Sequence, residues 1–475
     1  MGNFDYDLVC IGSGPAGQRA ATQAAKLGKC VAIIEKQRCV GGVCLETGTI
    51  PSKTFREAVR SFSTKLDFDM GLGLAPRARP EISHLLGRVN AVMTRESQVQ
   101  QYQLERNDID LLQGRASFVD PHTIAVTTDG SVRNVTTANI LVACGTKPTD
   151  PRGAKADGRT LITSDQVLHL DRLPRTMAVV GAGVIGIEYA SMFAALGVKV
   201  TMIDKRPKPL EFLDHEIIDE LIHQMRNRDV SFRLGEAVES IEIIEGHPTP
   251  HGSIKLESGK RVVADLVLFS VGRVGATDTM NLDAAGLESD DRGRLEVDDQ
   301  LRTNVPHIFA AGDVIGYPSL AATSSEQGRL AACHMFGIHT KAMSEHFPVG
   351  IYAIPEISMV GATEEQLTEQ RVPYETGIAR YREIARGQIL GDDTGVVKMM
   401  FHRETRRLLG VHAIGTGATE LIHVGQAVYA LGGDLDYFLN TVFNYPTLAE
   451  CYKVAALEAA NKLNLGQPNQ VVATA

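Results

Sequence analysis

The chain has 475 residues, of which 44% are hydrophobic and 22% charged, and its formal net charge is −9. This composition is ordinary for a globular protein with a large core, and the length predicts about two to four domains. The acidic balance, with no lysine- or arginine-rich run, argues against nucleic acid or an anionic membrane as partner. No apolar run approaches the length of a membrane span, and the start, MGNFDYDLVCIGSG, does not resemble a secretory signal.

The cysteines indicate the redox compartment. There are seven, and they are scattered and odd in number, with no Cys-x-x-Cys pair. This pattern indicates reduced thiols in a cytoplasmic protein, and argues against both a disulfide framework and a zinc site. We therefore expect a cytoplasmic protein without a bound metal, in which most cysteines are small core residues.

The first predicted element is a strand–turn–helix–strand unit in DLVCIGSGPAGQRAATQAAKLGKCVAIIEK (residues 7–36). Gly12, Gly14 and Gly17 form a Gly-x-Gly-x-x-Gly turn, and the second strand ends at Glu35. The first glycine makes a tight turn, the second lets the backbone approach a pyrophosphate, and the third allows close helix–strand packing. The helix amides face the phosphates, and the carboxylate can accept hydrogen bonds from a ribose diol. The unit predicts a dinucleotide site.

The next stretch, GGVCLETGTIPSK (Gly41–Lys53), resembles a redox-active motif in which two cysteines five positions apart open a helix. Cys44 occupies the first cysteine position, whereas the second holds Thr49. One sulfur cannot form a dithiol, so this stretch needs another explanation.

The strand–turn–helix–strand unit is duplicated in MAVVGAGVIGIEYASMFAALGVKVTMIDK (residues 177–205). Five positions of the first unit recur 169 residues later, and they are Gly181, Gly183, Gly186, Gly197 and Asp204. Two dinucleotide sites in one chain predict FAD together with a nicotinamide cofactor.

Three further apolar runs suggest how the domains are arranged. NILVACGTKP (Asn139–Pro148), DLVLFSVGRVG (Asp265–Gly275) and HIFAAGDVIG (residues 307–316) each read as a strand leading to a glycine. They predict an α/β protein with an FAD-binding domain over 1–150 and 276–347, interrupted by an NAD(P)-binding domain over 151–275. Residues 348–475 contain strand-like and helical runs that complete the chain as an α+β dimerisation domain, with a loose tail, GQPNQVVATA.

The order of these motifs resembles the flavoprotein disulfide reductases that carry two dinucleotide sites. AAGDV (Ala310–Val314) and Lys53 in IPSK make the resemblance specific. It implies that Asp313 hydrogen-bonds the ribityl chain of FAD, and that Lys53 lies near flavin N5 and pairs with Glu188. A cation there would stabilise the anionic reduced flavin. The resemblance also implies a homodimer, or a larger homo-oligomer, in which the partner subunit completes each flavin site.

The resemblance implies a full set of contact positions. Catalytic roles fall to Lys53, Glu188 and Cys44. The positions expected to contact FAD are Gly12, Gly14, Pro15, Gly17, Glu35, Lys36, Gly41, Gly42, Cys44, Lys53, Gly114, Ala116, Ala143, Cys144, Gly145, Gly312, Asp313 and Ala321, and Gly272 and Arg273 are expected to contact one of the two cofactors. Those expected to contact the nicotinamide nucleotide are Gly181, Gly183, Ile185, Gly186, Asp204, Lys205 and Arg206.

The chain departs from that family at two positions of the same half-reaction. Family members that reduce disulfides carry a histidine before Pro-Thr, with a glutamate three residues after the threonine, as acid/base for thiol exchange. FNYPTLAE keeps Pro446, Thr447 and Glu450 but has Tyr445 in place of the histidine. With Thr49, this points to a branch that has abandoned disulfide chemistry, and GTIPSK and FNYPT are similar to the soluble pyridine nucleotide transhydrogenases.

That branch implies transfer of a hydride between NADPH and NAD through FAD, one nucleotide after the other. Asp204 favours the free ribose of NAD, while the cations of Lys205 and Arg206 could pair with the 2′-phosphate of NADP. They could equally be a solvated turn, and Cys44 either lines the flavin or is a small apolar filler. Alternatives are an NAD(P)H dehydrogenase of quinones or oxygen, a dihydrolipoamide dehydrogenase-like protein without disulfide activity, or a non-catalytic flavoprotein.

Overall fold

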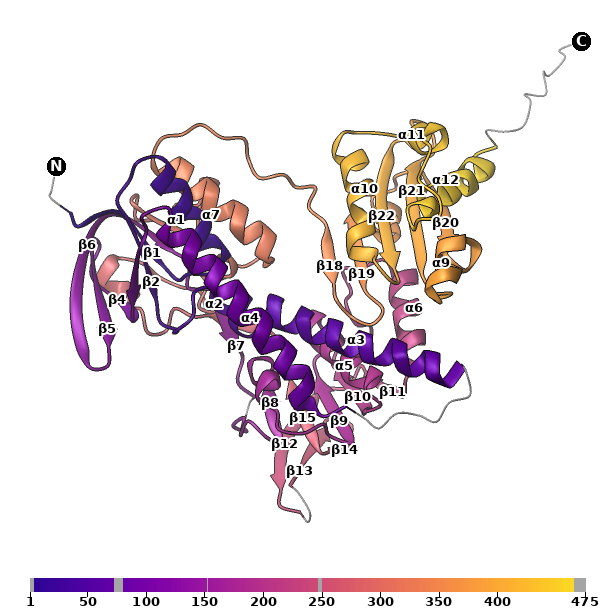
Figure 1. Ribbon diagram of the computed structural model, residues 1–475, viewed down its shortest axis with the longest axis horizontal. Helices are drawn as coiled ribbons and strands as arrows, with labels where there is room; N and C mark the ends of the chain where they lie inside the picture. The colour runs from indigo at the N-terminus through magenta and orange to yellow at the C-terminus, as the bar shows by residue number, and fades with distance from the viewer. Residues whose placement is uncertain (1–3, 72–79, 152, 247–249, 465–475) are drawn as a thin grey trace, which may run out of the picture. The chain divides into compact units, whose positions relative to one another are not determined.

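The computed structural model describes residues 4–71, 80–151, 153–246 and 250–464. The chain divides into two compact units (Figure 1). The first comprises residues 1–174, 240–253 and 265–343, and the second comprises residues 175–239, 254–264 and 344–475. Among the described residues, no helix is both long enough and apolar enough to cross a membrane.

The first unit is built on a sheet with the strand order β3-β2-β1-β6-β5-β4. β1 (Tyr6–Ile11) lies in its middle and pairs in parallel with β2 (Val31–Glu35) and with the second half of β6 (Ser131–Val142). β3 (Asp110–Gln113) extends the parallel part beyond β2, and β17 (Ile308–Ala310) pairs in parallel with β6. The run HIFAAGDVIG therefore contributes a strand to the same sheet as the first glycine motif.

Shorter elements complete this unit. β4 (Arg115–Asp120), β5 (Thr123–Thr128) and the first half of β6 form an antiparallel meander. β7 (Thr146–Pro148) pairs with β16 (Arg273–Gly275), and β8 (Leu161–Thr163) pairs with β15 (Leu266–Phe269). The 3-10 turns are η1 (Ser164–His169), η2 (Leu282–Ala285) and η3 (Asp313–Ile315).

Both faces of β1 are buried, as expected for a strand inside a parallel sheet. Leu8 and Cys10 point into one apolar cluster, and Val9 and Ile11 point into another. The first cluster lies under α1 (Pro15–Lys26) and α7 (Ala321–Met335), which lie side by side (Figure 1). The other helices are α2 (Gly42–Glu46) and the mutually packed α3 (Thr49–Gly71) and α4 (Ile82–Glu105).

The second unit begins with three parallel strands, β9 (Thr176–Val180), β10 (Lys199–Asp204) and β11 (Val230–Leu234). α5 (Val184–Ala195) connects the first two, and its residues from Gly186 to Ala195 are all buried, Glu188 among them. α6 (His215–Arg226) connects the next two strands, and the side chain of Asp214 caps its first turn. Three strands lie at the boundaries between the sequence segments of the two units. They are β12 (Val238–Ile244), β13 (His251–Leu256) and β14 (Arg261–Ala264).

The C-terminal part of the second unit is an antiparallel sheet with the order β18-β19-β22-β21-β20. Its strands are β18 (Val349–Ile351), β19 (Ile357–Gly361), β20 (Tyr374–Arg380), β21 (Val396–His402) and β22 (Leu408–Ile414). Its helices are α8 (Glu364–Glu369), η4 (Tyr381–Glu383), α9 (Ala385–Leu390), α10 (Ala418–Ala430), α11 (Leu435–Asn440) and α12 (Glu450–Lys462). Tyr381, Phe401, Phe438 and Tyr452 anchor its apolar core.

The predicted α/β class is confirmed, and each predicted strand and helix is present in its place. The sequence sufficed to predict these elements because they are apolar runs that end near glycine, a signal that depends only on neighbouring residues. The predicted loose tail, residues 466–475, lies outside the described residues, and the predicted domain boundaries stay a prediction.

Candidate functional site

The first glycine turn (Gly12–Gly17) is a close contact between backbones. Gly12 has a φ of +107°, and a Cβ there would lie 2.4 Å from the carbonyl oxygen of Ala143. A Cβ on Gly17 would lie 1.9 Å from the carbonyl oxygen of Gly12. A Cβ on Gly14 would meet nothing within 4 Å, and this residue caps α1 without a side-chain hydrogen bond. Gly14, Pro15 and Ala16 line the cavity, so the N-terminus of α1, where a phosphate is stabilised, borders it.

The acid that ends β2 is held by this turn. Glu35 is buried, and its Oε2 accepts hydrogen bonds from the amide of Ser13 at 3.0 Å and from its hydroxyl at 2.6 Å. Oε1 accepts one from the amide of Gln37 at 2.8 Å. The carboxylate is thus fixed beside the turn, with acceptor capacity left on Oε1.

A cavity of about 390 Å³ opens in front of the turn, entirely within the first unit. Most of the expected FAD contacts line it: Gly12, Gly14, Pro15, Glu35, Lys36, Gly42, Cys44, Gly114, Ala116, Ala143, Cys144, Gly145, Gly312, Asp313 and Ala321. Among the described residues, the lining does not include Gly17, Gly41, Lys53, Gly272 or Arg273. Gly17 and Gly41 are constrained by packing instead, since a Cβ on Gly41 would lie 2.5 Å from that of Leu45.

Two polar groups in this cavity suit a ligand rich in hydroxyl groups. Thr47 lines the cavity, and its Oγ1 atom is buried without a hydrogen-bond partner among the described residues. Within the described part of the chain, the carboxylate of Asp313 accepts one long hydrogen bond, 3.5 Å, from the hydroxyl of Ser324. Burial raises the pKa of Asp313, and the nearby charge of Arg273 partly offsets this. A ribityl chain would supply the donors that these acceptors lack, so the residues fit FAD.

Arg273 acts beside the cavity. Its guanidinium donates to the Thr146 hydroxyl at 2.9 Å, the Thr146 carbonyl at 2.9 Å and the Asp165 carboxylate at 2.9 Å, and both partners line the cavity. Gly272, at φ +90°, precedes it. Arg273 therefore orders the wall of the cavity, which is a supporting role that its motif alone did not reveal.

The second glycine turn (Gly181–Gly186) repeats these contacts in the second unit. Gly181 has a φ of +105°, matching Gly12. Asp204 accepts hydrogen bonds from the amide of Ala182 at 2.6 Å and from that of Arg206 at 2.9 Å. Burial acts to raise the pKa of Asp204, but the hydrogen bonds from Arg206 outweigh it and keep the pKa below its ordinary value. The duplicated motif is thus a duplicated hydrogen-bond pattern.

Three comparisons bear on this arrangement. Residues 6–328 match the family model described as pyridine nucleotide-disulphide oxidoreductase, and residues 347–456 match the dimerisation domain of that family. The chain belongs to the pyridine nucleotide-disulphide oxidoreductase family.

Two curated relatives from different bacteria carry the same name. The soluble pyridine nucleotide transhydrogenase of Mycobacterium tuberculosis strain H37Ra is 50% identical over 465 residues, which is 97% of this chain and 98% of that protein. The protein of the same name from Klebsiella pneumoniae is 43% identical over 97% of this chain and 99% of that protein. The expected similarity to this branch of the family is confirmed.

Solved structures are similar over almost the whole chain. The HOCl-induced flavoprotein disulfide reductase RclA of Escherichia coli has a TM-score of 0.86 at 26% identity, covering 95% of this chain and 99% of that chain. LpdA of Mycobacterium tuberculosis gives the same score, identity and coverage. The fold of this oxidoreductase is therefore shared with flavoprotein disulfide reductases.

The sulfur position of the oxidoreductase holds a single free thiol. Cys44 lies in α2 and lines the cavity, and Thr49, at the start of α3, lines it too. Burial raises the pKa of the Cys44 thiol, and a hydrogen bond from Thr49 offsets this only in part. A thiol held in its protonated form is a poor nucleophile.

Tyr445 stands where the family members that reduce disulfides have the histidine that acts as acid/base. Tyr445 is 67% exposed, so its phenol does not pack within the described chain. Glu450 opens α12, and its Oε2 atom is buried without a hydrogen-bond partner among the described residues.

Lys53 and Glu188 lie in different units. The ammonium of Lys53, on α3, donates to the hydroxyl of Ser52 at 3.3 Å. Glu188, on α5, is buried and accepts a hydrogen bond from the amide of Tyr352 at 2.9 Å. Their expected pairing stays a prediction.

Sequence reasoning missed several residues of the cavity. Ser13 holds Glu35, and Thr47 and Asp165 line the wall, while the buried side chain of Gln327 accepts from the amide of Gly312 at 2.9 Å. The position of Ser13 between two glycines was a usable signal. Thr47 lies within the Gly41–Lys53 stretch, but nothing in that stretch marked it as a contact. Asp165 and Gln327 belong to no motif and are brought in by folding.

Proposed function

We propose that this oxidoreductase transfers a hydride between NADPH and NAD, using FAD held in the cavity of the first unit. The observation that carries the proposal is the Cys44–Thr49 pair, which places one protonated thiol and one hydroxyl where two sulfurs would be needed. Electrons that cannot pass to a disulfide need another acceptor, and the second glycine turn offers a site for a second nicotinamide nucleotide. The names of the relatives support this assignment.

The residues of the first unit would hold FAD. When bound, FAD supplies the capacity to take up and release a hydride. The amides that open α1 would stabilise its pyrophosphate, and the free acceptor site on Glu35 would take a ribose hydroxyl. Asp313 and Thr47 would accept hydrogen bonds from hydroxyl groups, and Lys53 would stabilise negative charge, with Glu188 as its counter-ion.

The second glycine turn would bind both nicotinamide nucleotides. Because FAD takes the first turn, donor and acceptor must use the second one in succession. Initial rates measured with NADPH and a reducible NAD analogue should therefore give parallel lines in double-reciprocal plots. Intersecting lines would require a second nicotinamide site. NADPH oxidation by quinones or oxygen that outpaces reduction of the analogue would favour a dehydrogenase instead.

We also propose a cytoplasmic homodimer. The segment that matches a dimerisation domain exposes large apolar side chains: Leu431 is 87% exposed, Val442 is 93% exposed and Tyr445 is 67% exposed. Contacts with a second copy would bury them. A molar mass near 51.4 kDa in light scattering, which is the mass of one chain, would argue against the dimer.

A further inference from the structure

The acid of the second glycine turn is fully occupied in the free protein. Asp204 accepts four hydrogen bonds, two on each oxygen. Two come from the amides of Ala182 and Arg206. The other two come from the guanidinium of Arg206, with Nη2 at 2.7 Å from Oδ2 and Nε at 3.0 Å from Oδ1. A carboxylate offers about four lone-pair sites, so none is left for the hydroxyl of a ribose.

The acid of the first glycine turn, Glu35, accepts fewer hydrogen bonds than Asp204 does. Glu35 accepts three hydrogen bonds, from the amide and hydroxyl of Ser13 and from the amide of Gln37. Ser13 and Gln37 occupy the places of Ala182 and Arg206, 169 positions earlier. The backbone contacts are therefore the same in both copies. Only the second copy places a cation over its acid, and only its acid lacks a free acceptor site.

The side chain that covers Asp204 is partly exposed to solvent. The side chain of Arg206 is 37% exposed, whereas that of Asp204 is 6% exposed. A partly exposed guanidinium exchanges partners at modest cost, because water and salt screen the ion pair. A 2′-phosphate carries more negative charge than a carboxylate and accepts a bidentate contact from arginine.

We propose that Arg206 is an exchangeable counter-ion that selects between NADP and NAD. It covers Asp204 in the free protein, moves to the 2′-phosphate when NADP binds, and must be displaced by the ribose hydroxyls when NAD binds. Arg206 thus favours NADP and at the same time competes with NAD for Asp204. This inference rests on the proposed function, since it requires both nucleotides to use the second glycine turn.

The test is equilibrium binding of NAD⁺ and of NADP⁺ to the oxidised, FAD-containing protein, measured by calorimetry. Arg206→Ala should weaken NADP⁺ by about 10- to 100-fold, the range for a charge-assisted hydrogen bond. It should tighten NAD⁺ by about 2- to 10-fold, because Asp204 becomes free. Lys199→Ala removes the same charge from an exposed position at the other end of β10 and should leave the ratio of the two dissociation constants unchanged.

The tightening of NAD⁺ is the decisive result. Loss of a cation near an anionic nucleotide would otherwise weaken binding, so weaker NAD⁺ binding by Arg206→Ala, or an unchanged ratio, would overturn the inference. Arg206→Lys keeps the charge without the two-point contact and should give intermediate ratios. Retained FAD absorbance shows that each variant is folded. Failure of the unaltered protein to pass a hydride from NADPH to an NAD analogue would instead reject the proposed function, independently of these binding ratios.

Discussion

Thr49 decides which chemistry is open to Cys44. Both side chains line the same cavity, and Thr49 acts to lower the pKa of the Cys44 thiol, against the larger effect of burial. The two positions therefore share one cavity but supply only one sulfur. The protein should accordingly show no lipoamide or glutathione reductase activity at rates comparable to transfer between NADPH and NAD.

Restoring the second sulfur tests this explanation. Thr49→Cys should form a disulfide with Cys44 on mild oxidation, because both positions line one cavity and the helices that carry them, α2 and α3, are in contact. Intact-mass measurement should then show the loss of two hydrogens, about 2 Da, while Thr49→Ser should show none. A Thr49→Cys protein that keeps both thiols free under the same oxidant would mean that the geometry is wrong for a disulfide.

Lys53 is expected to act on the rate of hydride transfer. Lys53→Met removes the cation proposed to stabilise developing negative charge, so reduction by NADPH should slow by about 10- to 100-fold, the range for loss of one charge-assisted contact. FAD content should not change. Stopped-flow absorbance checks the rate, and Lys53→Arg, which keeps the charge, should lose less. Reduction of Lys53→Met at the unaltered rate would assign Lys53 a purely structural role.

At the scale of elements, the contact between α1 and α7 places the glycine turn. A Cβ on Gly328 of α7 would lie 2.0 Å from the carbonyl oxygen of Ala16 on α1, so the two helix backbones touch. Backbone cannot yield as a flexible side chain can. Any larger residue at position 328 must therefore push α7 away from α1, the helix whose N-terminus borders the cavity.

Gly328→Ala should destabilise the protein by about 1–3 kcal/mol, the usual cost of overpacking, and should weaken FAD retention. Gly87→Ala in α4 is the matched control, because a Cβ there meets nothing within 4 Å. That change should stabilise by up to about 1 kcal/mol through helix propensity. Thermal unfolding and FAD release measure both variants, and equal stability of the two would show that the helices separate without cost.

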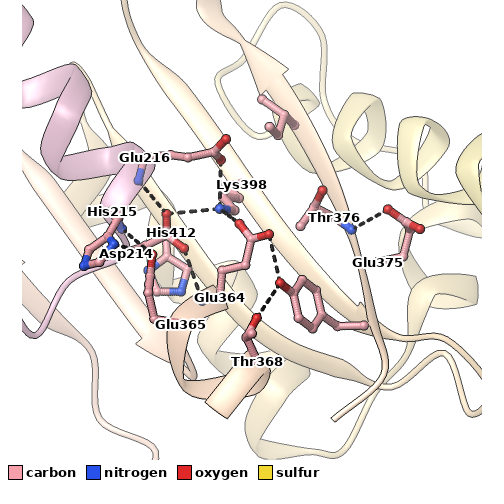
Figure 2. A network of polar contacts seen from close by, with 12 residues as sticks. Asp214, His215, Glu216, Glu364, Glu365, Thr368, Glu375, Thr376, Lys398 and His412 are labelled. Atoms are coloured by element: carbon pink, nitrogen blue, oxygen red, sulfur yellow. Dashed lines mark hydrogen bonds and ion pairs between the residues drawn. The ribbon is translucent and has the colours of Figure 1, made fainter. Parts of the chain in front are cut away.

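At the scale of the whole molecule, one buried lysine joins the two parts of the second unit. Lys398, on β21, is 1% exposed, and its ammonium pairs with Asp214 at 3.1 Å and Glu216 at 2.8 Å (Figure 2). It also pairs with Glu364 of α8. Asp214 is fully buried at the start of α6. The β9–β11 sheet and the antiparallel sheet are therefore tied through one cation.

Lys398→Met should destabilise the protein by about 3–5 kcal/mol at pH 7, because it leaves the carboxylate of Asp214 buried without a cation. The midpoint of urea unfolding measures this loss. Lys255→Met is a suitable control, since Lys255 pairs with Glu239 at the surface, where a salt bridge contributes at most about 1 kcal/mol.

The loss should depend on pH. Burial acts to raise the pKa of Asp214, but His412 and Lys398 outweigh it and hold the pKa below 3.8. In the unaltered protein, the stability that the ionised Asp214 contributes is complete above the pKa of aspartate in the unfolded chain, near 3.9. It is lost only as the pH falls through the lower pKa of Asp214 in the folded protein. Without Lys398, the pKa of Asp214 should rise, and His412 should be protonated more readily.

Protonation of Asp214 and of His412 at low pH would each reduce the free-energy cost of the unpaired buried charge in Lys398→Met. The deficit of Lys398→Met should therefore be smaller at pH 5 than at pH 7. Urea midpoints at the two pH values check this. A deficit that is constant with pH would show that lost packing, and not a buried charge, causes the effect.

The sequence alone determined those features that depend on local pattern. Gly12, Gly14 and Gly17, with an acid at Glu35, predicted the first strand–turn–helix–strand unit, and recurrence of the pattern predicted the second. Such units are specified by residues within about 30 positions, where periodicity and glycine placement act directly. The absence of a second sulfur at Thr49 and of a histidine at Tyr445 was equally readable, because each is a single substitution in a recognisable motif.

Only the tertiary structure decided the contacts between distant residues. Lys398 and Asp214 are 184 positions apart, and no motif links them. Nor does the sequence show that the side chain of Arg206 turns back onto Asp204 while Gln37 leaves Glu35 open. Burial, and the exact count of hydrogen bonds on a carboxylate, depend on how packed elements place donors around it. The sequence pattern thus predicted that Glu35 and Asp204 are the acids of the two turns. The fold determined that Glu35 keeps a free acceptor site for a hydroxyl group, whereas Asp204 does not.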